Sequence, residues 1–248
     1  MTTTLSGDRP ANASSKPSTA PRDPLPAVLI GLTMTTGLVD AISVLGLGSV
    51  FTANMTGNVV FLGFAAVGTP GFSIVRSLAA LVAFLVGAVV GGCFAMRLAA
   101  ESRRRWLLSA AAIEAGVMLV AAVIALGYDR TTLEPVTGLY AMIVLTALAM
   151  GLRNATVRKL AVADLTTSVL TLALTGLAAD SSLAGGGNTR WGRRLASVLA
   201  ILLGAAVGAV LVTTVGPAVP LAITALVTVV LTVAYAVHPA SKVEAHGP

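Results

Sequence analysis

The chain has 248 residues, of which 56% are hydrophobic and only 10% are charged, and its mean hydropathy is +0.92. Soluble domains usually carry about 25% charged residues, so this composition excludes an ordinary soluble protein. The net charge of +6 is better explained by basic loops that orient a membrane protein than by nucleic-acid binding, and we expect no nucleic-acid partner.

Both ends of the chain are polar. Residues 1–24 are rich in Ser, Thr, Pro and Ala and lack apolar periodicity, which predicts a disordered cytoplasmic tail. This tail lacks the apolar stretch that a cleavable signal peptide contains, so we expect the first membrane helix to direct insertion. Residues 238–248 form a second, shorter polar tail.

Eight apolar segments lie between the two tails, and they fall into two sets of four. A membrane-spanning helix needs about 20 apolar residues. The second segment of each set is the shortest and most polar, so it is the one whose crossing is in doubt. The segments are 27–46, 53–69, 74–96 and 106–127, followed by 136–157, 165–183, 193–215 and 217–237.

The two sets resemble each other in sequence. The stretch "RSLAALVAFLVGAVVGG" (76–92) matches "RRLASVLAILLGAAVGA" (193–209), and "GLVDA" (37–41) matches "GLRNA" (151–155). The shared order and nearly constant spacing predict two membrane repeats, 25–127 and 136–237. Both copies of the first stretch carry small residues four apart, which indicates close helix packing. These small residues are Ala83, Gly87 and Gly91, and Ala200, Gly204 and Gly208.

The distribution of Lys and Arg favours six crossings over eight, because basic residues collect on the cytoplasmic side. Eight crossings would place 9 basic residues inside and 7 outside. If the two polar segments enter and leave by one face, 14 lie inside, Arg153 among them, and only Arg76 and Arg130 lie outside. We therefore predict an all-α polytopic bundle of two inverted repeats, with six full crossings, two short polar re-entrant segments and both termini cytoplasmic.

The most polar of these segments begins "TANMTGNVV" (52–60), where amide and hydroxyl side chains alternate. Such groups are costly in hydrocarbon unless they are paired. One interpretation is that Asn54, Thr56, Gly57 and Asn58 line a solute cavity near the bilayer midplane. The other is that they bond to neighbouring helices as packing contacts. The matching block of the second repeat places Thr167 and Thr171 in the same role.

The stretch "GLVDAISVLGLGSVFTANMTGNVVFLG" (37–63) resembles the signature of the YoaK-like family of bacterial inner-membrane proteins. The later "GLRNATVRKLAVADLTTSVLTLALTGLA" (151–178) resembles that family's second block, although this chain reads Thr171-Leu172-Ala173 where Thr-Gly is more usual. The resemblance implies a multi-pass protein of the bacterial plasma membrane. It implies no substrate, because the family's activity is uncharacterised.

Two carboxylates lie within the apolar segments. Asp40 lies near the end of the first segment, and its counterpart Asn154 keeps the polarity without the charge. It either faces a polar interior or is solvated at the membrane surface. Glu114 lies eight residues after Trp106, which places it near mid-bilayer. An ionised glutamate there is costly unless paired, so we expect a protonated or hydrogen-bonded group that is either structural or part of a proton, cation or amine site.

These features favour a small-solute transporter or channel with a polar site at the repeat interface, proton-coupled through Glu114 or Asp40. The alternative is a non-transporting membrane scaffold or accessory subunit. We predict no enzyme, cofactor or metal site, because both histidines lie in the C-terminal tail and Cys93 is the only cysteine. The expected partners are membrane lipids and an unidentified small solute.

Overall fold

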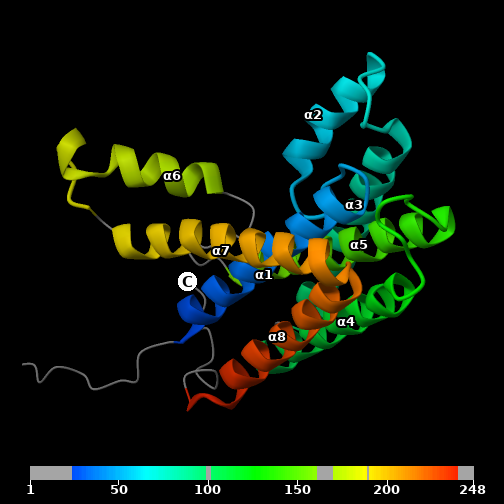
Figure 1. The fold of residues 1–248 in the computed structure, drawn as a ribbon. Helices are drawn as coiled ribbons and strands as arrows, with labels where there is room; N and C mark the ends of the chain where they lie inside the picture. Colours follow the sequence, from blue (N-terminus) through cyan, green and yellow to red (C-terminus); the bar gives the residue numbers. More distant parts are fainter. Residues whose placement is uncertain (1–23, 99–101, 161–169, 189, 240–248) are drawn as a thin grey trace, which may run out of the picture.

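The computed structural model describes residues 24–98, 102–160, 170–188 and 190–239. In these ranges the chain forms α-helices and one short 3-10 turn, and six helices are long and apolar enough to cross a membrane, which confirms the predicted class (Figure 1). They are α1 (Leu25–Gly46), α3 (Ile74–Leu98), α4 (Arg103–Ala125), α5 (Val136–Leu160), α7 (Trp191–Val215) and α8 (Ala218–Val237).

Two further apolar helices are too short to cross. α2 (Met55–Ala66) has 12 residues and α6 (Leu170–Ala179) has 10, which at 1.5 Å per residue gives about 18 and 15 Å against a hydrocarbon core of roughly 30 Å. α2 packs on α3 and α6 packs on α7 (Figure 1). The predicted segment 165–183 lies partly outside the described residues, so its path before α6 stays a prediction.

The six long helices alternate in direction. α1, α4 and α7 begin at the end of the bundle where α3, α5 and α8 finish, and Leu25, Trp106, Val157 and Tyr235 pack together there. We call this the basic end, because nine of the twelve described Lys and Arg residues lie at it. They are Arg97, Arg103, Arg104, Arg105, Arg158, Lys159, Arg190, Arg193 and Arg194. The opposite end carries Arg76 and Arg130.

The charge count places Arg153 at the cytoplasmic surface, and the structure shows that this is wrong. It lies within α5, seven residues before the helix ends, and it is only 2% exposed. α5 continues through Arg158 and Lys159, which occupy its last turn. Cations are favoured at that position by the helix dipole, so these two residues mark the surface and Arg153 belongs to the interior.

The small-residue stripes pack helices of the first half closely against helices of the second. α3 lies on α5, with Gly87 against the backbone of Leu148. α1 lies on α7, with Gly204 against the backbone of Met34. In both cases a Cβ atom on the glycine would overlap a carbonyl oxygen of the other helix. These stripes therefore serve helix packing, as the sequence indicates.

The remaining contacts close the bundle around α4 and α8. These two helices pack on each other, α4 also packs on α5, and α8 also packs on α1. At the end opposite the basic end, the Tyr128 hydroxyl donates a 2.8 Å hydrogen bond to the Gly46 carbonyl at the end of α1. Burial raises the pKa of Tyr128 to about 12, so the phenol stays a protonated donor at physiological pH.

Candidate functional site

Four helices meet around a buried ion pair at the centre of the bundle. Arg153 of α5 donates from Nε to Glu114 Oε1 of α4 at 2.9 Å, and its Nη2 also contacts that oxygen. Glu114 is 4% exposed. An unpaired ion in such an interior costs several kcal/mol, so each residue makes the burial of the other tolerable.

The guanidinium is fully hydrogen-bonded. Nη1 donates to Thr35 Oγ1 at 2.7 Å and to the Leu32 carbonyl at 3.2 Å, both on α1, and Thr36 Oγ1 lies 3.4 Å away. Nη2 donates to Thr228 Oγ1 of α8 at 2.9 Å. An arginine offers five N–H donors, and here all five have acceptors from α1, α4 and α8.

Threonines provide this polar lining without breaking the helices. Thr228 lies 2.8 Å from the Thr224 carbonyl one turn earlier, and its hydroxyl is 3.2 Å from Glu114 Oε1. Thr35 and Thr36 contact the Leu32 carbonyl in the same manner, at 2.8 and 3.1 Å. Each hydroxyl thus has a backbone acceptor in its own helix and still offers lone pairs to Arg153.

The ion pair lies at mid-height of the bundle. Glu114 is eleven residues from each end of α4, and Thr228 is close to the middle of α8. At 1.5 Å per residue, Glu114 lies about 16 Å from either end, which is the centre of a roughly 30 Å hydrocarbon core. Glu114 thus lies midway along α4, and its depth in a bilayer stays a prediction.

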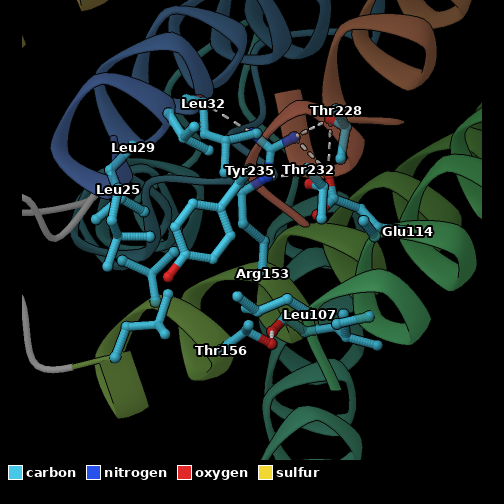
Figure 2. Close-up of a pocket in the computed structure, with 16 residues that line it drawn as sticks. Leu25, Leu29, Leu32, Leu107, Glu114, Arg153, Thr156, Thr228, Thr232 and Tyr235 are labelled. Carbon is cyan, nitrogen blue, oxygen red and sulfur yellow. Dashed lines mark hydrogen bonds and ion pairs between the residues drawn. The ribbon is translucent and has the colours of Figure 1, made fainter. Parts of the chain in front are cut away.

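A cavity of about 40 Å³ lies beside the pair, toward the basic end. Figure 2 shows Arg153 and Glu114 at one side of it and the ring of Tyr235 at the other. Thr156 and Thr232 add hydroxyls to a lining that is otherwise mostly aliphatic. This volume exceeds the roughly 10–15 Å³ that one buried water requires, so the cavity can hold a few water molecules or a small solute in their place.

The packing around this cavity is unequal. Toward the basic end it is closed by one cluster of side chains that includes Leu25, Leu107 and Tyr235, and Arg103 lies 5.9 Å from the Tyr235 ring centre. Toward the other end lies an extended packed core with Met118, Met142 and many further residues of α1, α4, α5 and α8. The larger packed core therefore lies on the side of the ion pair away from the basic end.

The structure gives the residues of the polar motif local roles at the start of α2. Asn58 is fully buried; its Oδ1 accepts from the Phe51 amide at 2.9 Å and its Nδ2 donates to the Phe51 carbonyl at 2.5 Å. Asn54 caps α2 by accepting from the Gly57 amide at 3.2 Å, and Gly57 packs on the Phe51 ring. Thr56 is exposed. Across the described residues, no hydrogen bond joins this motif to Glu114.

The other predicted residues are also separate from the ion pair. Asp40 lies one turn beyond Thr36 on α1, and its Oδ1 is buried without a hydrogen bond in the described ranges. Asn154 follows Arg153 on α5 and donates to the Met150 carbonyl at 2.9 Å. Thr171 is exposed on α6, and Thr167 lies outside the described residues.

Sequence reasoning missed Arg153 and the threonines that receive its hydrogen bonds. One signal was present: Arg153 falls inside the predicted segment 136–157, four residues before that segment ends, and an arginine within an apolar segment favours a functional site. A second signal for a polar interior is the row of threonines spaced four residues apart on α8, which are Thr224, Thr228 and Thr232. Among the described residues, no three His, Cys, Asp or Glu side chains gather as they would around a metal ion.

Comparison with known proteins agrees with this architecture. A family model described as a protein of unknown function, DUF1275, matches residues 28–234. The UPF0700 transmembrane protein YoaK of Bacillus subtilis (strain 168) is 33% identical over 154 residues, which are 61% of this chain and 64% of that protein. No solved structure matches the chain. The chain is therefore a multi-pass membrane protein that belongs to the DUF1275 family.

Proposed function

We propose that this protein is a small-solute transporter or channel, and that the Arg153–Glu114 pair with its cavity is the solute site. The observation that supports this proposal is the position of the pair: two opposite charges beside a cavity at mid-membrane depth. Ionisable residues at such a depth are rare and usually serve solute or proton pathways. We therefore propose transport rather than catalysis.

The helix pairings support the further proposal that residues 25–127 and 136–237 are inverted repeats. In order along the chain, helices α1 to α4 of the first half correspond to α5 to α8 of the second. The packing of α3 on α5 then corresponds to that of α7 on α1, and the packing of α4 on α5 corresponds to that of α8 on α1. The short helices correspond as well, since α2 packs on α3 and α6 packs on α7. Transporters built from inverted repeats place the solute where the repeats meet, and Glu114 and Arg153 belong to different halves.

One observation favours the rival function, a non-transporting scaffold or accessory subunit. All five N–H donors of Arg153 have acceptors in the protein, and a saturated polar network also serves to fix a unique helix arrangement. A scaffold has no need of the cavity, whereas a transporter does. The two functions are therefore separated by filling the cavity while leaving the ion pair in place.

We expect Ala111→Leu to lower solute flux at least tenfold in proteoliposomes, because Ala111 lines the cavity and a leucine would fill it. Stopped-flow light scattering would compare glycerol, urea, glycine and lactate against protein-free vesicles. Ala112→Leu is the matched control, since the next residue of α4 is exposed and faces away from the cavity.

Two results would contradict the transport proposal. One is a wild-type protein that accelerates none of the four solutes. The other is equal flux in Ala111→Leu and wild type. Gel filtration in detergent would establish whether Ala111→Leu is folded. If it is not, Ala111→Val fills less of the cavity and can be tested in its place.

We also propose that the protein resides in the bacterial plasma membrane with its basic end in the cytoplasm, because Lys and Arg accumulate on that side. In a Cys93→Ser background, an impermeant maleimide added to whole cells should label Thr69→Cys, in the loop between α2 and α3. It should not label Ser182→Cys, in the loop between α6 and α7, until the cells are opened. Both positions are exposed, so the reverse pattern would invert the proposed orientation.

A further inference from the structure

Resting on the proposed function, we infer that the solute is a small monocarboxylate, which binds Arg153 together with one proton on Glu114. The argument begins with charge. A guanidinium is protonated at every physiological pH, so Arg153 contributes one positive charge in all states of the site. With Glu114 ionised, the pair has a net charge of zero, which is the state that a buried low-dielectric site tolerates best.

Solutes differ in what they do to this balance. A cation beside Arg153 would give the site a net positive charge, and an anion bound alone would give it a net negative charge. An anion that arrives with a proton keeps the site neutral: the proton neutralises Glu114, and the anion replaces the glutamate as the counter-ion of Arg153. The same exchange returns the site to its empty state when both leave.

The hydrogen bonds at the site fit this exchange. Every bond that Glu114 receives in the described residues reaches Oε1, which makes this oxygen the group that an incoming carboxylate would replace. Arginine binds carboxylates through two N–H groups in a planar fork, and Nε and Nη2 form such a fork here. Thr228 would still donate to the carboxylate or to the Thr224 carbonyl.

Among the described residues that line the cavity, Arg153 is the charged group that faces Glu114. From α8 the neighbours are Thr228, Thr232 and Tyr235, and from α1 they are Thr35 and Thr36, with Asp40 one turn further along. On α3, Cys93 and Arg97 are exposed on the outside of the bundle. Proton uptake at the pair is therefore assigned to Glu114.

The cavity selects the remainder of the solute. Its volume of about 40 Å³ admits only a few non-hydrogen atoms, and the walls away from the ion pair are Leu25, Val28, Leu29 and Leu107. Such walls accept a methyl or ethyl group and offer few acceptors for an ammonium. Acetate offers a carboxylate for Arg153 and a methyl group for the aliphatic walls. Glycine would place an ammonium against those walls, and chloride has no alkyl group to fill them.

Isothermal titration of the purified protein with acetate tests the inference. Titrations in two buffers of different ionisation enthalpy should report uptake of about one proton per acetate, and the affinity should then fall about tenfold for each unit rise in pH. Glu114→Gln imitates the protonated residue, so it should bind acetate with little pH dependence and no proton uptake. Ala111→Leu should abolish binding and Ala112→Leu should retain it.

Acetate binding without proton uptake in the wild type would overturn the inference, as would glycine or chloride binding in preference to acetate, or no binding of the three. The proton count needs no variant, so a misfolded Glu114→Gln does not affect it. If glycerol or urea flux is found without acetate binding, the transport function stands and the inference fails. If acetate binds with a proton but no solute is transported, the site is an anion site and the transport function fails.

Discussion

Arg153→Met should lower the free energy of unfolding by about 3–5 kcal/mol at pH 8, because it leaves the Glu114 carboxylate buried without its cation. Methionine fills much of the same space, so the cost comes chiefly from the lost charge partner and less from a cavity. Reversible unfolding in mixed micelles with increasing dodecyl sulfate measures it. Arg158→Met is the matched control, because Arg158 is exposed five residues later on the same helix, and its replacement should change stability by less than about 0.5 kcal/mol.

The double variant Arg153→Met/Glu114→Gln should recover much of that loss. A neutral amide at position 114 can still hydrogen-bond to Thr228, and no unpaired charge remains. The double-mutant cycle should therefore give a coupling energy of about 2 kcal/mol or more between the two positions. If the two single effects are additive, the pair does not act as an interdependent unit.

Gly87→Ala and Gly204→Ala should each destabilise the bundle by about 1–3 kcal/mol, because the new methyl group overlaps a carbonyl oxygen of the facing helix. The first glycine belongs to the α3–α5 contact and the second to the α1–α7 contact, so the two effects should add. Gly92→Ala is the control. No atom lies within 4 Å of a Cβ built at Gly92, and alanine favours a helix over glycine by about 0.5–1 kcal/mol.

Unfolding of the four proteins under one set of conditions measures these effects. We expect Gly92→Ala to be neutral or slightly stabilising. Unchanged stability in both Gly87→Ala and Gly204→Ala would mean that the helices separate at little cost, and the close packing of the two halves would then not contribute to stability.

The class and the number of crossings follow from the sequence because apolar length and charge distribution are local properties. Each long segment carries its own signal, and α2 and the described part of α6 are shorter than a membrane crossing requires. The glycine stripes were also readable, since a spacing of four places them on one helix face. Which helix each stripe faces depends on the tertiary arrangement, and that information was not in the pattern.

The candidate site was only half predictable. The depth of Glu114 follows from its distance along one helix, whereas its partner lies 39 residues later on another helix. Arg153 was assigned to the surface because a charge near the end of an apolar segment usually marks its boundary. Asn58 was misleading for a different reason: its polar atoms bond to the Phe51 backbone seven residues earlier, and only the loop geometry brings these two residues together.

The order in which the partners of Arg153 are synthesised bears on how this helix enters the bilayer. A lone arginine within a membrane helix opposes insertion by up to about 2.5–3.5 kcal/mol on translocon scales, the full cost applying at the helix centre. Leu32, Thr35 and Glu114 precede Arg153 in the chain, and only Thr228 follows it. When α5 leaves the ribosome, its counter-ion and most of its acceptors are already in the membrane, so α4 and α5 can insert as a neutral hairpin before α8 exists.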